Sequence, residues 1–446
     1  MKIIIVGAGE VGTHLAKLLS REKQDIILID EDENRLTSLS SSYDLMTVTA
    51  SPTSIKVLKE HGVGDADLFI AVTPDESQNI TACIIAGNLG AKKTVARVDN
   101  GEYLLPKNKE FFKNLGIDSL IYPEMLAAEE INISLKHSWV RQWWEFCGGA
   151  LILIGAKIRE NAEILDIPLY QLGGPDMHYH IVAIQRNNET LIPGGQDVVK
   201  LNDIVYFTTT RKHVSLIRKL AGKDSFPDVK NIMIMGASDI TARTINSLPS
   251  HMKVKVFEKD INLGMRLSSE IDEGTMIING DARDLDLLVS EGLDKSQTFL
   301  ALTGNTETNI LACLAARRLG VKKVIAEVEN IDYIGMAESL DIGTVINKKL
   351  IAASHIYQML LNADVSNVKC LTFANADVAE FTVKEGSRIT KSPVRHLGLP
   401  RGTTIGGLVR NGVGVVVTGD TQVQPGDHVV VFCLSTMIKN IEKFFN

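Results

Sequence analysis

The chain has 446 residues, of which 45% are apolar and 23% charged, a composition typical of globular proteins and a length that suggests three or four domains. Its 47 basic and 54 acidic residues give a net charge of −7 without a long Lys/Arg tract, which argues against a nucleic-acid-binding surface. The five cysteines are scattered and contain no Cys-x-x-Cys pair, so we expect a reducing compartment and neither a disulfide framework nor a structural zinc site.

Strands and helices are expected to alternate through residues 1–122. Apolar runs predict strands at residues 2–6, 25–30, 45–49, 67–72 and 93–98. Segments with helical periodicity predict helices at residues 10–20, 32–40, 53–61 and 77–89. Such alternation predicts an α/β fold with a Rossmann-like, doubly wound parallel sheet, and the same order recurs from residue 231 to 346.

A helical stretch and then a β-rich segment follow each predicted sheet. The helices are expected at residues 125–136 and 349–361, and the β-rich segments close on strands at 204–208 and 428–433. Residues 212–230 connect the two halves. The chain is therefore predicted to hold two tandem units in four domains, at residues 1–124, 125–228, 229–348 and 349–446. The first residues show no signal-peptide pattern, and no apolar run of about 18 residues predicts a membrane span.

The first predicted strand runs directly into a glycine-rich loop, Gly7-Ala8-Gly9-Glu10-Val11-Gly12. In a dinucleotide-binding loop, Gly7 permits the tight turn, Gly9 leaves room for the pyrophosphate, and Gly12 lets the helix pack closely on the strand. Asp30 ends the second strand, where a carboxylate can accept hydrogen bonds from a ribose, and Glu31 beside it favours NAD over NADP. A glycine-rich turn without a ligand is the alternative.

Further candidates lie where the fourth and fifth strands end. Thr73-Pro74 follows the fourth strand, at the sheet edge where open α/β sheets bind ligands, although a plain turn is the alternative. Arg97 ends the fifth strand and could approach a phosphate, with a surface charge as the alternative. Its counterpart in the second copy is Glu327.

The second glycine loop is degraded. Ser238 replaces the middle glycine and Thr241 the last, and Asp239 would place a negative charge near a pyrophosphate. Gly236 and Glu258 remain at the positions of Gly7 and Asp30. An empty structural pocket and a weak or altered ligand site both stay open, and dinucleotide binding like that of the first copy is not expected.

The sequence offers little sign of catalysis. There is no Gly-x-Ser-x-Gly, His-Glu-x-x-His or Walker motif. His178 and His180 share a strand and could in principle bind a metal, but a third ligand is not evident, and surface histidines are the alternative. Trp139, Trp143 and Trp144 are interpreted as core or subunit interface. We therefore expect no catalytic and no metal-binding residue.

Taken together, these segments resemble the family of TrkA-type regulatory subunits of the Trk potassium-uptake system, which contain two tandem RCK (regulator of K⁺ conductance) units. The resemblance covers essentially the whole chain. Its markers are residues 1–9 (MKIIIVGAG), 70–73 (IAVT), 96–98 (ARV), 300–303 (LALT), 399–406 (LPRGTTIG) and 424–429 (QPGDHV).

The resemblance implies NAD(H) and adenine nucleotides such as ATP and ADP as ligands. It also implies a homo-oligomeric ring, a tetramer of two-unit chains, docked on the cytoplasmic face of the membrane under a K⁺-translocating subunit of the TrkH or TrkG type. By position in the family's motif, the nucleotide contacts would be Gly7, Ala8, Gly9, Glu10, Val11, Gly12, Asp30, Thr73, Pro74 and Arg97. One departure is that Ala50-Ser51 follows the third strand, where the family often has Gly-Asp and the second copy keeps Gly280-Asp281.

The expected function is therefore nucleotide-dependent regulation of K⁺ uptake rather than turnover. An NAD-dependent oxidoreductase with an unrecognised substrate site is the alternative. A redox-sensing transcriptional regulator is a third interpretation, against which stands the lack of a basic helix-turn-helix segment.

Overall fold

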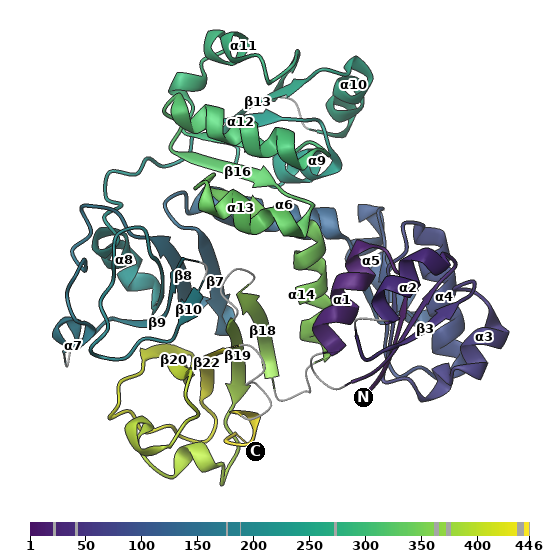
Figure 1. Ribbon diagram of the computed structural model, residues 1–446, viewed down its shortest axis with the longest axis horizontal. Coiled ribbons are helices and arrows are strands. Elements are labelled where there is room, and N and C mark those ends of the chain that lie inside the picture. Colours follow the sequence, from purple (N-terminus) through teal and green to yellow (C-terminus); the bar gives the residue numbers. More distant parts are fainter. Residues whose placement is uncertain are drawn as a thin grey trace. The chain divides into compact units, whose positions relative to one another are not determined.

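The computed structural model describes residues 1–20, 24–40, 43–174, 177–187, 189–271, 274–360, 365–371, 376–434 and 441–445 (Figure 1). These residues form two compact units. The first comprises residues 1–128 and 347–360, and the second comprises residues 129–346 and 361–446. None of the described helices is long and apolar enough to cross a membrane.

The first unit contains a six-stranded parallel sheet in the order β3-β2-β1-β4-β5-β6. Its strands are β1 (Lys2–Val6), β2 (Asp25–Asp30), β3 (Met46–Thr49), β4 (Leu68–Ala71), β5 (Thr94–Arg97) and β6 (Ser119–Ile121). The helices are α1 (Glu10–Ser20), α2 (Glu33–Ser40), α3 (Ile55–Glu60), α4 (Glu76–Leu89) and α5 (Pro106–Asn114). Residues 3–6 of β1 are fully buried, as in a central strand whose sheet is covered on both faces.

The second unit contains a parallel sheet of the same topology, in the order β14-β13-β12-β15-β16-β17. The strands are β12 (Asn231–Met235), β13 (Lys253–Glu258), β14 (Met276–Asn279), β15 (Thr298–Ala301), β16 (Lys323–Glu327) and β17 (Thr344–Ile346). The helices are α9 (Asp239–Asn246), α10 (Ile261–Glu270), α11 (Leu285–Ser290), α12 (Thr306–Arg318) and α13 (Ile334–Ser339). The predicted tandem doubly wound sheets are thus confirmed.

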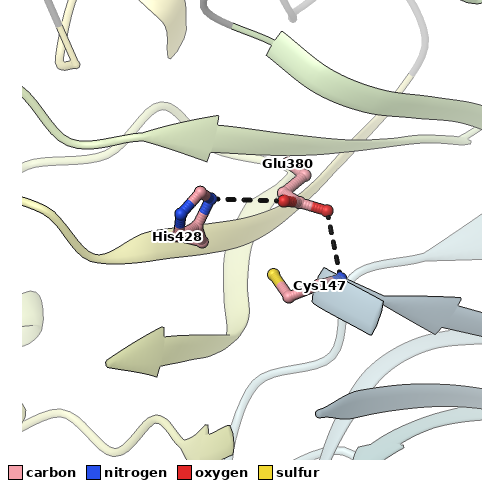
Figure 2. Close-up of side chains that lie close together, drawn as sticks. All are labelled: Cys147, Glu380 and His428. Carbon is pink, nitrogen blue, oxygen red and sulfur yellow. Dashed lines mark hydrogen bonds and ion pairs between the residues drawn. The ribbon is translucent and has the colours of Figure 1, made fainter. Parts of the chain in front are cut away.

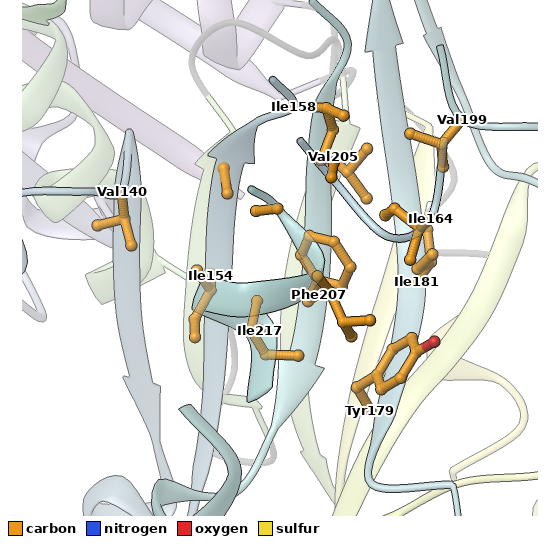
Figure 3. Close-up of a cluster of buried hydrophobic side chains, with 14 of the residues drawn as sticks. Val140, Ile154, Ile158, Ile164, Tyr179, Ile181, Val199, Val205, Phe207 and Ile217 are labelled. Carbon is orange, nitrogen blue, oxygen red and sulfur yellow. The ribbon is translucent and has the colours of Figure 1, made fainter. Parts of the chain in front are cut away.

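The first β-rich domain is a five-stranded antiparallel sheet in the order β10-β9-β11-β8-β7. Its elements are β7 (Gln142–Phe146), β8 (Leu151–Lys157), α7 (Leu169–Leu172), β9 (Tyr179–Arg186), β10 (Glu189–Leu191), β11 (Ile204–Thr209) and α8 (Val214–Leu220). One face of the sheet packs on α8 and the surrounding segments around Phe207, Ile154 and Ile217 (Figure 3). Trp139 and Trp143 belong to this core, in line with the interpretation of the tryptophans as core residues.

The second β-rich domain has the order β18-β19-β22-β20-β21 and shares a core with the first. Its strands are β18 (Val365–Leu371), β19 (Ala376–Thr382), β20 (Thr403–Arg410), β21 (Val413–Val416) and β22 (His428–Leu434). Trp144 and Phe146 of the first domain pack with Val430 and Phe432 of the second. A Cβ at Gly406 would lie 2.9 Å from Val182 Cγ1, so the two domains approach each other closely.

Two helices join the parallel sheets to the β-rich domains. They are α6 (Pro123–Lys136) and α14 (Lys348–Leu360). In the first unit α14 packs along α1, and Ala352, Ala353 and Ile356 are fully buried (Figure 1). In the second unit the buried Asn132 of α6 donates a hydrogen bond to the Thr244 carbonyl of α9 at 3.4 Å. Each connecting helix thus contacts the first helix of the other half, α14 against α1 and α6 against α9.

Short elements are where the structure departs from the predicted elements. The three-residue strand β6 completes the first sheet and helix α5 precedes it, although neither element was predicted. The helix predicted at residues 53–61 is shorter, because the Ser54 hydroxyl accepts a hydrogen bond from the Val57 amide and caps α3.

Candidate nucleotide-binding site

The three glycines of the first loop lie in different surroundings. Gly7 has a φ of +103°, and a Cβ there would lie 2.8 Å from the Thr73 nitrogen. A Cβ at Gly12 would lie 1.9 Å from the Gly7 carbonyl oxygen, so the close packing of α1 on the loop leaves no room for a side chain at this position. A Cβ at Gly9 would meet no atom within 4 Å. Gly7 and Gly12 thus serve the turn and the helix packing, and Gly9 faces open space.

The Asp30 carboxylate holds the glycine loop to the end of β2. Its Oδ2 accepts a hydrogen bond from the Ala8 amide at 2.6 Å, and its Oδ1 accepts one from the Asp32 amide at 2.8 Å. Asp30 is 8% exposed. Each carboxylate oxygen can accept more than one hydrogen bond, so the carboxylate can still receive ribose hydroxyls.

A network centred on Asn79 joins the ends of β4 and β5. The Asn79 Oδ1 accepts hydrogen bonds from the Thr73 amide at 2.9 Å and the Thr73 hydroxyl at 2.7 Å. The Asn79 Nδ2 donates to the carbonyls of Thr73 at 2.9 Å and Arg97 at 3.0 Å. Pro74 follows at an exposed position. The Thr73 hydroxyl is engaged within the fold and helps to shape this edge of the sheet, and a nucleotide contact of Thr73 stays a prediction.

Arg97 lies at the same edge with part of its guanidinium unpaired. Its Nη2 is 3.2 Å from Asp99 Oδ1, and its side chain is 22% exposed. Its buried Nε has no hydrogen-bond partner among the described residues. A buried donor without a partner costs free energy, which an anion at this position would relieve.

The remaining loop residues divide between core and surface. Ala8 and Val11 are buried. Glu10, at the start of α1, is exposed and forms an ion pair with Lys349 of α14. The predicted loop residue Glu10 is thus tied to the connecting helix of the second half, a contact that spacing alone could not reveal.

The second glycine loop keeps the turn and changes the helix start. Gly236 has the same φ of +103° as Gly7, and Glu258 Oε2 accepts a hydrogen bond from the Ala237 amide at 2.8 Å. Ser238 caps α9 by accepting from the Thr241 amide at 3.4 Å. The Thr241 hydroxyl donates to the Gly236 carbonyl at 2.8 Å, so a polar contact replaces the glycine packing of the first copy.

A cavity of about 470 Å³ opens at this second loop. Its lining includes Asp281 and Arg283, whose side chains form a two-pronged ion pair. Hydrogen bonds from the Arg283 side chain lower the pKa of Asp281 to about 2. Arg266 pairs with Asp239 at 2.8 Å, so the charge expected to repel a pyrophosphate is balanced by a neighbour.

An ion cluster surrounds Asp341 in the second unit, and no sequence motif indicated it. Lys157 and Arg317 lie 2.9 Å from the Asp341 carboxylate and Arg159 lies 3.3 Å from it, and Arg141 also pairs with it. Burial opposes ionisation of Asp341, but Arg141 and Lys157 outweigh it and hold the pKa of this carboxyl well below its usual value. The cluster connects the first β-rich domain to the second parallel sheet.

Other ionisable groups around the cluster respond to burial. Burial and the nearby Arg159 lower the pKa of Lys223 to about 7. Burial raises the pKa of Glu338 to about 7. The Lys323 ammonium is buried and donates to the Val140 carbonyl at 2.9 Å and to Thr344 Oγ1 at 3.0 Å.

His178 directly precedes β9 and His180 lies on it, and among the described residues the two belong to no group of three potential metal ligands. His178 is exposed and stacks on His213 with ring centroids 3.9 Å apart. His180 is half-buried, with Nε2 3.2 Å from the Thr404 hydroxyl, and burial lowers its pKa to about 4. The surface interpretation is therefore wrong for His180, because its ring lies against the second β-rich domain.

Family models match both halves of the chain. The TrkA-N domain matches residues 3–123 and 232–348, and the TrkA-C domain matches residues 153–222 and 378–446. The chain is 31% identical to the Trk system potassium uptake protein TrkA of Haemophilus influenzae over 453 residues, covering 100% of this chain and 98% of the relative. It is 30% identical to the protein of the same name from Halomonas elongata, with the same coverage, and 30% identical to a TrkA homolog of Archaeoglobus fulgidus, with full coverage of both chains.

Solved structures share the fold. The GsuK channel superposes with a TM-score of 0.63 at 15% identity, over 99% of this chain and 78% of that chain. The isolated GsuK RCK domain gives a TM-score of 0.60 at 14% identity, over 100% and 94% of the two chains. A structure of the GsuK channel bound to NAD gives 0.61 at 14% identity, over 100% and 78%.

Proposed function

This chain belongs to the TrkA family of potassium-uptake proteins, and from that premise we propose that it is a nucleotide-sensing regulatory subunit. In this proposal it gates a K⁺-translocating membrane subunit of the TrkH or TrkG type from the cytoplasmic side. Relatives named as potassium-uptake proteins argue for regulation, and the chain is not an enzyme. The oxidoreductase alternative is therefore set aside.

The observation that carries the proposal is the open space at Gly9, in the loop whose Ala8 amide donates a hydrogen bond to the Asp30 carboxylate. A pyrophosphate placed there would face the amides at the helix N-terminus, and the adenosine ribose would reach Asp30. The unpaired Nε of Arg97 offers a further donor to a phosphate. NAD(H) fits these groups, and ATP or ADP would use the same phosphate and ribose contacts. Structures of the GsuK channel with NAD and with ADP make these nucleotides the first to test.

Helix α1 would transmit the effect of ligand binding away from the glycine loop. Glu10 begins this helix and pairs with Lys349 of α14, which packs along α1. A nucleotide that shifts the start of α1 would therefore also shift α14. A ligand changes such an equilibrium only by its differential affinity for the two states, typically about 1–3 kcal/mol of coupling.

Ring assembly is supported by apolar side chains that remain exposed on α12 and α13. Leu311 is 66% exposed and Met336 is 47% exposed, with Leu319 and Leu340 at the ends of the same helices. We take these exposed apolar side chains as part of an association surface. We propose a homo-oligomer, a tetramer of two-unit chains, that presents a ring to the membrane partner.

The decisive experiment titrates NADH, NAD, ATP and ADP by calorimetry into wild type and Asp30→Asn. The asparagine keeps an oxygen that can accept the Ala8 amide but removes the charge that binds the ribose hydroxyls. Glu258→Gln is the matched control at the equivalent position of the second copy. We expect weaker binding in Asp30→Asn and unchanged high-affinity binding in Glu258→Gln. Wild type that binds none of the four nucleotides would refute the proposal.

A further inference from the structure

Three side chains that bind metals in other proteins meet where the two β-rich domains share a core (Figure 2). Cys147 opens a short 3₁₀ turn, η3 (Cys147–Gly149), directly after β7 of the first domain. Glu380 lies on β19 and His428 begins β22, both in the second domain. One ligand atom of each, Sγ, a carboxylate oxygen and a ring nitrogen, lies within 4.8 Å of the other two.

Glu380 contacts both of the other residues, Cys147 and His428. Glu380 is 2% exposed, and its Oε1 lies 3.4 Å from His428 Nδ1. Its Oε2 accepts a hydrogen bond from the Cys147 amide at 3.4 Å. Cys147 has a φ of +49°, which is uncommon for a residue with a side chain and is retained where the surroundings hold it. The thiol is thus held on a turn that points across the interface.

We propose that Cys147, Glu380 and His428 form a binding site for Zn²⁺ that ties the two β-rich domains together. A thiolate, an imidazole and a carboxylate are the donors that zinc takes in proteins, and three protein ligands leave the fourth tetrahedral position to water. The side chain of His428 is 43% exposed, so an ion and a water molecule can reach the group from solvent.

The ligand atoms need only a modest contraction to hold the ion. Zinc–ligand bonds of roughly 2.0–2.3 Å place tetrahedral donors roughly 3.3–3.8 Å apart. The present separations of up to 4.8 Å would close by about an ångström. His428 can supply this movement because its side chain is 43% exposed, whereas Glu380 is only 2% exposed.

Zinc binding must displace the thiol proton. Without the ion, burial and the neighbouring Glu380 raise the pKa of the Cys147 thiol to about 12, so the sulfur is protonated at neutral pH. Coordination forms the zinc–sulfur bond and releases that proton to solvent. Affinity is therefore expected to rise with pH.

The test loads the full-length, reduced protein with Zn²⁺, and with Co²⁺ as a spectroscopic substitute. We expect one equivalent of metal per chain, with visible bands of tetrahedral cobalt and a sulfur-to-cobalt charge-transfer band in the near ultraviolet. Cys147→Ala should abolish the charge-transfer band, and His428→Gln should weaken zinc binding at least tenfold. The matched controls, buried Cys83→Ala and exposed His396→Gln, should bind like wild type.

A second measurement needs no variant. Zn²⁺ should slow alkylation of Cys147 in wild type, read by mass spectrometry, while the buried Cys83, Cys313 and Cys433 serve as internal references. Wild type that binds no stoichiometric zinc, or metal binding that survives in both Cys147→Ala and His428→Gln, would overturn the proposal. Unchanged Cys147 alkylation in zinc-saturated protein would overturn it as well. Nucleotide binding at the first glycine loop should be independent of these two variants.

Discussion

Replacing Gly9 by alanine separates the folding role of the glycine loop from its role in binding. Gly9 does not adopt a left-handed φ, and a Cβ there would meet no atom within 4 Å. The free energy of unfolding should therefore stay unchanged or rise by about 0.4–1 kcal/mol, because alanine reduces the freedom of the unfolded chain. The new methyl group would occupy the space proposed for the pyrophosphate. Overpacking of this kind costs about 1–3 kcal/mol, which weakens NADH binding by about 5- to 150-fold.

Gly12→Ala is the control for a loop that is disturbed by packing alone. Its Cβ would lie 1.9 Å from the Gly7 carbonyl oxygen, so α1 must move and both stability and affinity should fall. Calorimetric titration with NADH and urea unfolding of the three proteins distinguish the two effects. Gly9→Ala that binds NADH as tightly as wild type would refute the placement of the phosphates at this loop.

Three further predictions concern the second unit. Asp341→Asn should lower the free energy of unfolding by about 3–5 kcal/mol, because it leaves four cations without their shared acid. Because the folded-state pKa of Asp341 is lowered, its contribution to stability is complete above the ordinary pKa of 3.8 and is lost at lower pH. The difference in unfolding free energy between wild type and Asp341→Asn, measured in urea, should therefore become smaller below pH 3.8. Lys223→Met should stabilise the protein more at pH 7 than at pH 10. The folded-state pKa of Lys223 is lowered to about 7, so below the ordinary pKa of 10.5 folding must remove a proton from Lys223, which costs free energy. A difference in unfolding free energy between variant and wild type that does not change with pH would contradict this. Leu311→Asp should reduce the assembly size measured by light scattering without unfolding the chain, since this side chain is 66% exposed; an unchanged mass would exclude α12 from the assembly surface.

The sequence predicted the parallel sheets well because their strands are long apolar runs between helix-period segments. The six-stranded sheets and the antiparallel β-rich domains follow that pattern. Strand β6 was missed because its three residues carry no periodic signal, and it is recognised only by its pairing with β5. Its neighbour α5 was missed although Pro106 stands at its first turn, a recognised helix start.

The packing of the first glycine loop could also be predicted from the sequence, whereas contacts between distant segments could not. The distinct surroundings of Gly7, Gly9 and Gly12 agree with the packing roles inferred from spacing. The pair between Glu10 and Lys349 joins the two halves of the chain, so no motif could indicate it. The same holds for the cluster of Cys147 with Glu380 and His428, whose members lie in different halves and lack any zinc-binding spacing.

The position of α14 along α1 has a consequence for dividing the chain. Cutting between the halves would strip the amino-terminal fragment of the helix that covers α1, and would leave Ala353 and Ile356 on the other fragment facing water. Neither fragment would then be a complete folding unit, yet mixing the two should restore the missing contact in trans. A tandem gene product built this way resists separation into two independent sensors, because each half supplies part of the other's interior.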